Sequence, residues 1–338
     1  MAKIFGQNRL NSNGLYSMFV WQKGLPREVV VDDIMPMRSW GSGFNFWFNG
    51  RGEDGSMWGP IAEKVWAKTN GAYGDIESGN VLEGYYFLTG VPGYHASDVT
   101  SDATATYNLI HGLAQNGNFI SAGSNCATCS SLGIVAGHAY SVHDAYQLST
   151  GQCLVHVRNP WSSERYSGAW GREDSNWTTA MVDELRSKGA PEHALDINSN
   201  DGDFFMNCSD FSTGFRSLMT VPNADGWKSQ FVEAVEGGVN EWRNLYFTNN
   251  VQQDVAVAFD FWGLRNYPEG CASGSTLVYL MVYNEANSRI ASYNLWTRYG
   301  FNAVHLQDLA PGTYRVRNMF SWGTGFDNKD YAFRVLSE

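Results

Sequence analysis

The spacing of hydrophobic and polar residues predicts helices and strands in the first two thirds of the chain and mainly strands in the last third. The clearest helix is predicted over Met57–Thr69, where apolar residues recur every three or four positions, and Gly71 follows as a suitable cap. The same spacing predicts a helix over Ala105–Asn116, and a further short helix is predicted over Ala180–Ser187.

Strand patterns surround these helices. Met18–Trp21 and Glu28–Asp32 are predicted to form a hairpin across a turn that contains Gly and Pro. Strands are predicted over Asn118–Ala122, Ile134–His143 and Cys153–Arg158, and we expect them to form an antiparallel sheet.

The chain changes character after Pro222–Gly226, which is predicted to be a linker because it contains Pro, Asn and Gly. Short β-rich runs then alternate with turns; examples are Asp254–Phe259, Thr276–Tyr283 and Thr313–Asn318. Regular short strands with few helical signals indicate an antiparallel β-sandwich over residues 227–338.

Composition narrows the class of protein. With 338 residues, 43% hydrophobic and 14% aromatic, the chain can build two or three packed domains. A net charge of −11 argues against nucleic-acid binding, and no run of apolar residues is long enough for a transmembrane segment or a signal peptide.

The cysteines, five in number and without a disulfide-like pattern, favour a reducing compartment, so a cytoplasmic location is expected. Cys126 and Cys129 have the spacing of a redox pair or of half a zinc site, but no second pair follows, and we interpret them as two loop thiols. Cys153 and Cys208 are expected to be buried small apolar residues.

The strongest chemical signal is the pair His138 and Asn159. An imidazole acts as a general base when its second nitrogen is held by an acceptor, and the hairpin between the two residues would bring the Asn amide beside the ring. Pro160 fixes the backbone after the Asn, and Trp161 can shield the His–Asn hydrogen bond from water. This is the His–Asn half of a Cys-His-Asn protease site.

Other segments carry a family resemblance in a fixed order. The motifs are Val29-Val30-Val31-Asp32-Asp33-Ile34-Met35-Pro36, Met57–Gly71, Glu83–Gly90, Gly137–Val142 with Arg158–Trp161, Gly168-Ala169-Trp170 and Asp201–Met206. Together they resemble the calpain family of papain-like cysteine endopeptidases over residues 4–216. The ending of the chain resembles, less specifically, the C2-like sandwich that follows the calpain protease core.

The resemblance implies an α+β fold with a papain-like, two-lobed protease core followed by a C2-like antiparallel β-sandwich. Residues 1–89 would be the remainder of the first lobe, 90–221 the second lobe and 227–338 the sandwich. The implied activity is limited proteolysis of protein substrates inside the cell, with His138 and Asn159 as catalytic residues. No organic cofactor is expected.

The family's nucleophilic Cys belongs to a segment upstream of the part that matches this chain, so we expect the nucleophile outside the chain. Either a further segment or another chain supplies it, or the protein is an inactive calpain-like scaffold that binds other proteins. In the family the nucleophilic Cys begins a helix that packs in the first lobe. A first lobe without that helix is expected to expose an apolar patch.

Calcium regulates the family, and the resemblance makes Asp201 and Asp203 candidate calcium ligands. The family's other two carboxylates align with Arg165 and Arg172, and a cationic side chain repels calcium. A shift of one residue would instead bring in the carboxylates Glu164, Glu173 or Asp174.

Overall fold

The computed structural model describes residues 5–6, 11–52, 54–98, 102–124, 129–236 and 238–338. They form two compact units, one made of residues 1–92 with 226–338 and the other of residues 93–225. All strand pairs between named strands are antiparallel, and the helices lie between strands along the chain. The α+β class is therefore confirmed. None of the helices described is long and apolar enough to cross a lipid bilayer.

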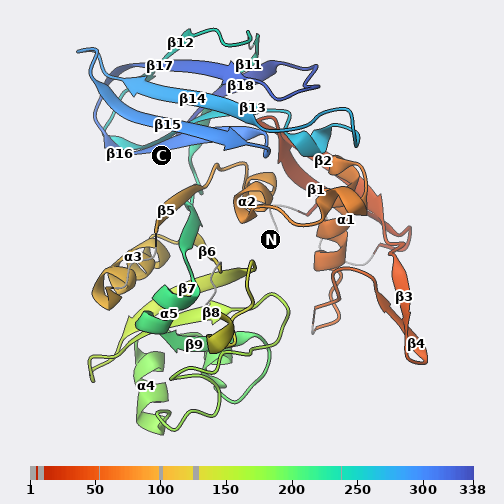
Figure 1. The fold of residues 1–338 in the computed structure, drawn as a ribbon, viewed down its shortest axis with the longest axis vertical. Coiled ribbons are helices and arrows are strands. Elements are labelled where there is room, and N and C mark those ends of the chain that lie inside the picture. The colour runs from red at the N-terminus through yellow and green to blue at the C-terminus, as the bar shows by residue number, and fades with distance from the viewer. Residues whose placement is uncertain (1–4, 7–10, 53, 99–101, 125–128, 237) are drawn as a thin grey trace. The chain divides into compact units, whose positions relative to one another are not determined.

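The unit of residues 93–225 is built on one six-stranded sheet (Figure 1). Its strands, in spatial order, are β5 (Tyr94–Asp98), β10 (Ser217–Val221), β6 (Phe119–Gly123), β7 (Ala139–Gln147), β8 (Cys153–Arg158) and β9 (Asp203–Asn207). The predicted strand Cys153–Arg158 has the predicted bounds, whereas the strand predicted over Ile134–His143 begins only at Ala139.

Helices cover both faces of this sheet. On one face α3 (Ala103–Gln115) and α5 (Cys208–Gly214) close a core that includes Val142, Val155 and Met206. On the other face α4 (Thr179–Ser187) packs with Leu154 and Phe205. Both faces of the sheet are therefore buried. Each side chain of β7, β8 and β9 faces either the core under α3 and α5 or the core under α4.

A β-bulge interrupts the pairing of β7 with β8. Val142 pairs with Val157, but Asp144 pairs with His156, so His143 is the extra residue. A bulge shifts the alternation of side chains between the two faces. Tyr140 and Val142 before it and Ala145 after it consequently all reach the same core.

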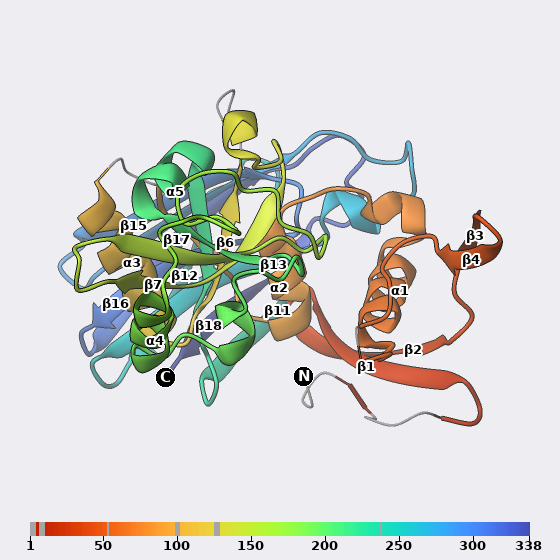
Figure 2. The same ribbon diagram turned by 90° about the horizontal axis from the view of Figure 1, so that it is seen from below.

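Residues 1–92 contain a hairpin, β1 (Leu15–Gln22) with β2 (Leu25–Asp32), packed against α1 (Trp58–Asn70) and α2 (Val81–Thr89) (Figure 2). A second hairpin pairs β3 (Met37–Trp40) with β4 (Gly43–Phe46). The predicted hairpin and the predicted helix over Met57–Thr69 are confirmed within a few residues. The shared core of this segment is small, with six buried side chains: Met18, Val20, Val31, Ile61, Val65 and Phe87.

Residues 226–338 form two four-stranded antiparallel sheets that enclose one core. The first sheet contains, in order, β11 (Lys228–Glu236), β18 (Asp330–Ser337), β13 (Gln253–Phe261) and β16 (Phe301–Leu309). The second contains β12 (Arg243–Asn249), β17 (Gly312–Ser321), β14 (Thr276–Tyr283) and β15 (Arg289–Thr297). Alternate burial along β14 and β17 is the period-two pattern of a half-buried strand.

A buried polar network joins this sandwich to residues 1–92. The Arg334 guanidinium donates to the Asp260 carboxylate, with Nε 3.0 Å from Oδ2, and its Nη1 donates to the Gly90 carbonyl at 2.7 Å. Tyr86 donates its hydroxyl proton to Asp260 and accepts from the Gly24 amide. Burial and the Asp260 charge raise the pKa of Tyr86 well above its ordinary value, so the phenol stays neutral and keeps donating.

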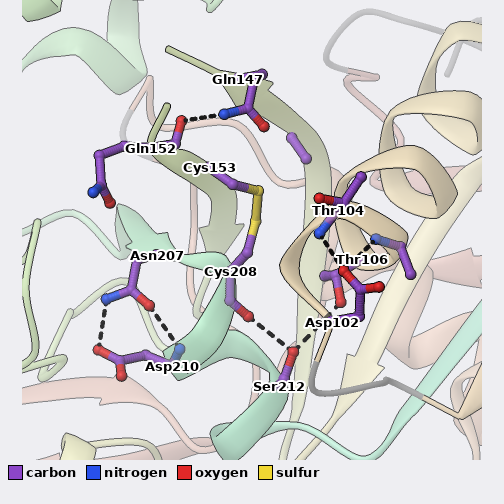
Figure 3. The surroundings of a disulfide bond; sticks show 12 residues. Asp102, Thr104, Thr106, Gln147, Gln152, Cys153, Asn207, Cys208, Asp210 and Ser212 are labelled. Carbon is purple, nitrogen blue, oxygen red and sulfur yellow. Dashed lines mark hydrogen bonds between the residues drawn. A yellow bond between two sulfur atoms is a disulfide. The ribbon is translucent and has the colours of Figure 1, made fainter. Parts of the chain in front are cut away.

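A disulfide joins Cys153 and Cys208 and ties the start of β8 to the start of α5 (Figure 3). Both residues are buried as predicted, but their interpretation as separate thiols is wrong. Leu154 pairs with Asn207 across β8 and β9, so the sheet register places the two cysteines opposite each other. With a disulfide present, the cysteines no longer favour a reducing compartment. The cytoplasmic location therefore stays a prediction.

Candidate active site

His138 and Asn159 meet at neighbouring ends of β7 and β8. His138 precedes β7 by one residue, Asn159 follows β8 by one residue, and the antiparallel pairing of Ser141 with Arg158 brings them together. His138 Nε2 lies 3.0 Å from Asn159 Oδ1. The predicted proximity is therefore confirmed, while the catalytic roles of the two residues stay predictions.

Two further hydrogen bonds fix which way the Asn159 amide points. Its Oδ1 accepts from the Trp161 backbone N–H at 3.1 Å, and its Nδ2 donates to the Ser163 carbonyl at 2.9 Å. A flipped amide would set a donor against a donor and an acceptor against an acceptor. The oxygen therefore faces His138 and, being an acceptor only, it selects the tautomer with the proton on Nε2.

The lone pair of the neutral ring is consequently on Nδ1. No hydrogen-bond partner of Nδ1 is found in the part of the chain that the structure describes, and the His138 side chain is half-buried. A general base requires this arrangement, because one nitrogen is held while the other can accept a proton.

The backbone of His138 is held by Ser124, which the sequence did not single out. The His138 N–H donates to the Ser124 hydroxyl at 3.0 Å, and the Ser124 N–H donates to the His138 carbonyl at 2.9 Å. Gly137 has a φ of +65°, a conformation that glycine adopts without steric cost. Ser124 is buried in a loop and contacts His138 although the two residues are 14 positions apart in the sequence.

Trp161 and Gly202 surround the pair. The Trp161 ring centroid lies 4.3 Å from that of His138, so one face covers the imidazole, although 58% of the residue is exposed. Gly202 accepts from the Asn159 N–H at 2.9 Å and has a φ of +98°. A Cβ there would lie 2.6 Å from the Asn159 carbonyl oxygen, so this close approach requires glycine.

Three of the four described cysteines are not available as a nucleophile for this imidazole. Cys129 is fully buried in the core, and Cys153 and Cys208 are joined to each other. Cys271 is exposed and belongs to the unit of residues 1–92 with 226–338. Cys126, the other member of the expected loop pair, lies outside the described residues.

Calcium binding at Asp201 and Asp203 stays a prediction, and the arrangement of charges does not favour it. The Asp203 carboxylate is engaged on both oxygens, by His156 at 2.9 Å and by Arg158. Asp201 Oδ1 accepts from the Asp203 backbone N–H at 3.0 Å. Within the described residues, these two carboxylates do not gather with a third acidic group at metal-ligand distances.

The alternative carboxylate Glu164 is also compromised as a calcium ligand. Its side chain is buried, and the Arg172 Nε lies 3.7 Å from Oε2. Burial raises the pKa of Glu164, and the neighbouring guanidinium opposes that rise.

An imidazole that is oriented by an asparagine amide and packed under a tryptophan defines the base half of a cysteine-protease site. The sequence model of the calpain cysteine protease family matches residues 1–221. The chain therefore belongs to the calpain family of cysteine proteases.

Individual relatives agree with this assignment. The chain is 27% identical over 267 residues to the calpain-1 catalytic subunit of Homo sapiens, covering 75% of this chain and 34% of that protein. It is 33% identical over 219 residues to the calpain-type cysteine protease ADL1 of Oryza sativa subsp. japonica, covering 62% of this chain and 10% of that protein. The chain thus spans about a third or less of the length of these relatives.

Proposed function

We propose that this chain provides the base half of a calpain-type cysteine endopeptidase, with His138 as general base and Asn159 as its orienter. The observation that carries the proposal is the fixed direction of the Asn159 amide, which leaves the His138 lone pair on Nδ1. The nucleophilic thiolate comes from polypeptide outside residues 1–338, and the substrates are proteins.

The chemistry follows from the two nitrogens of His138. Nδ1 takes the proton of the thiol, and the thiolate attacks the carbonyl carbon of a peptide bond. The imidazolium then protonates the leaving amine nitrogen, and an acyl-enzyme remains. Water hydrolyses the acyl-enzyme with His138 again accepting a proton, while Asn159 keeps the ring in place throughout.

Exposed aromatic side chains in residues 1–92 support the idea that a further polypeptide segment packs against this part of the chain. Trp40 is 64% exposed and Phe44 is 72% exposed, and both lie on the β3–β4 hairpin. Ile34, Trp47 and Trp58 in the same segment are exposed as well. Such a concentration of apolar surface is typical of an interface, and we propose that the nucleophile-bearing segment covers part of it.

The sandwich of residues 226–338 has a supporting role in this proposal. We infer that it is the C2-like domain of the family and that it holds the first segment through the Asp260–Arg334 pair. The proposed location of the enzyme is the cytoplasm.

The test is to supply the missing segment. The chain is expressed alone and fused behind a segment with a Gly-Asp-Cys-Trp sequence, and cleavage of a casein-like substrate is measured with and without a thiol-alkylating reagent. The chain alone is expected to be inactive, and the fusion is expected to cleave in an alkylation-sensitive manner.

His138→Ala in the fusion should lower the cleavage rate by roughly 1,000-fold or more. His111→Ala is the matched control and should keep the rate, because it changes a histidine on α3 that pairs with Asp144 of β7. A folded fusion without any cleavage would favour the scaffold function instead. Activity of the chain alone that disappears in Cys126→Ser or Cys129→Ser would show that the nucleophile is internal.

A further inference from the structure

A second group of histidines lies on the same sheet, away from the proposed catalytic pair. His143 on β7, His156 on β8 and Asp203 on β9 bring one ligand atom each to within 4.8 Å of the others. His156 Nε2 is 2.9 Å from Asp203 Oδ1, and His143 Nε2 is 4.0 Å from the same oxygen. The two imidazole rings stack with centroids 4.5 Å apart.

The strand register explains why these residues converge. His156 pairs with Phe205, and Asp203, two residues earlier on β9, points to the same face as Phe205. Val155 and Val157 reach the core on the other face, so His156 lies on the α4 side of the sheet. His143 follows Val142, which pairs with Val157 and faces the core, so the His143 ring lies on the opposite face of β7 beside His156.

The cluster is not satisfied as a purely structural hydrogen-bond group. His156 is fully buried, and its Nε2 is the nitrogen that faces the Asp203 carboxylate. His143 is 43% exposed on its side chain and reaches the Asp203 carboxylate only at 4.0 Å. The buried imidazole bonds one carboxylate, and the second imidazole is open to solvent. Together they provide ligand atoms and a route by which an ion can enter.

We propose that His143, His156 and Asp203 form a binding site for a divalent transition-metal ion, with zinc as the best match. Two imidazoles and one carboxylate are ligands that zinc, cobalt and nickel accept, whereas calcium and magnesium prefer oxygen donors. Zinc would replace the proton shared by His156 and Asp203, and water would fill the fourth tetrahedral position.

The distances are compatible with this ion after a small adjustment. Metal–nitrogen bonds of about 2.0–2.1 Å in a tetrahedron place ligand atoms about 3.3 Å apart. The 2.9 Å contact of His156 with Asp203 must open slightly, and His143 must turn inward from its 4.0 Å distance. His143 can turn because it is the exposed member of the group.

Two neighbouring residues bear on metal binding at this site. One affects the affinity for the ion, and the other offers a competing surface site. Arg158 donates to the second oxygen of Asp203, so its positive charge opposes the metal while it orients the carboxylate. His193 lies with its ring 6.3 Å from that of His156 and is exposed. His143 and His193 could also bind a metal ion as a pair of surface imidazoles. The variants must distinguish that pair from the proposed site.

The experiment uses the full chain without a polyhistidine tag. Cobalt is added while the visible ligand-field spectrum is recorded, and zinc is then titrated against a chromophoric chelator. One ion per chain with intense tetrahedral cobalt bands is expected, and His143→Ala should weaken zinc binding by about tenfold or more. Arg158→Gln should tighten it. His143→Ala is the informative variant, because it leaves the His156–Asp203 pair intact.

His111→Ala is the matched control, because His111 Nδ1 also lies 3.0 Å from a carboxylate, that of Asp144, but without a second imidazole. It should bind zinc as tightly as the unaltered chain. The proposal fails if His143→Ala binds zinc as tightly as the unaltered chain. It also fails if His193→Ala abolishes binding while a folded His156→Phe retains it.

Discussion

Two polar groups, one in each unit, are held in opposite ways. In residues 1–92 with 226–338, Asp260 and Arg334 are fully buried and each charged group has hydrogen-bonding partners. In residues 93–225, His138 is held on one nitrogen and open on the other. A saturated buried network fixes the position of chain segments, whereas a half-satisfied imidazole retains the capacity to accept a proton. His138, the proposed general base, therefore differs from the buried network in keeping one ring nitrogen available.

The largest loss of stability is expected when only one member of the buried Asp260–Arg334 pair is removed. Arg334→Ala leaves the Asp260 carboxylate buried without its cation and should lower the free energy of unfolding by about 3–5 kcal/mol. Chemical denaturation with circular dichroism measures the loss. Arg186→Ala is the matched control, because Arg186 forms exposed ion pairs with Asp183 and Glu192, and it should lower the free energy of unfolding far less than Arg334→Ala does.

The double variant Asp260→Leu with Arg334→Met sharpens the interpretation. If the cost of Arg334→Ala comes from an unpaired buried charge, removing both charges should recover most of the lost stability. Equal loss in the single and the double variants would instead show that packing and the Gly90 contact dominate.

The unit of residues 93–225 contains a covalent cross-link, the disulfide between Cys153 and Cys208. Cys153→Ala with Cys208→Ala should reduce the stability of residues 93–225 by about 2–4 kcal/mol. Limited proteolysis and denaturation measure the loss in oxidising buffer, and a reductant should reproduce it in the unaltered chain. Cys271→Ala, at an exposed position in the other unit, should change nothing. Stability unaffected by either treatment would contradict a bond between these cysteines.

A smaller, pH-dependent effect is expected at His305, whose Nε2 lies 2.7 Å from the Pro92 carbonyl. Burial lowers the pKa of His305 to about 4, so the unfolded chain binds a proton more readily than the folded one. Its contribution to stability is complete above the unfolded pKa of about 6.5 and is lost as the pH falls from there towards 4, by about 1–3 kcal/mol.

His305→Gln tests this effect by removing the titrating ring. The variant should show a flatter dependence of the unfolding free energy on pH between about 6.5 and 4 than the unaltered chain. Parallel pH profiles for the two proteins would exclude His305 as the source of the slope.

The sequence predicted much of the local structure and the pair His138 and Asn159, because helical spacing and short motifs are local signals. It did not predict the Cys153–Cys208 bond, Ser124 beneath His138 or the cluster of His143, His156 and Asp203. Each of these depends on the register between strands that are far apart along the chain. A single bulge at His143 changes which face its neighbours occupy, and no sequence pattern announces it.

The central claim is that Asn159 holds the proton of neutral His138 on Nε2 and leaves the lone pair on Nδ1. Long-range ¹⁵N–¹H correlation spectra at about pH 8, where ordinary imidazoles are neutral, distinguish the two ring tautomers directly. We predict the Nε2–H tautomer for His138 in the unaltered chain and a mixture of tautomers in a folded Asn159→Ala variant. A His138 ring protonated on Nδ1, or a spectrum that Asn159→Ala leaves unchanged, would contradict the account.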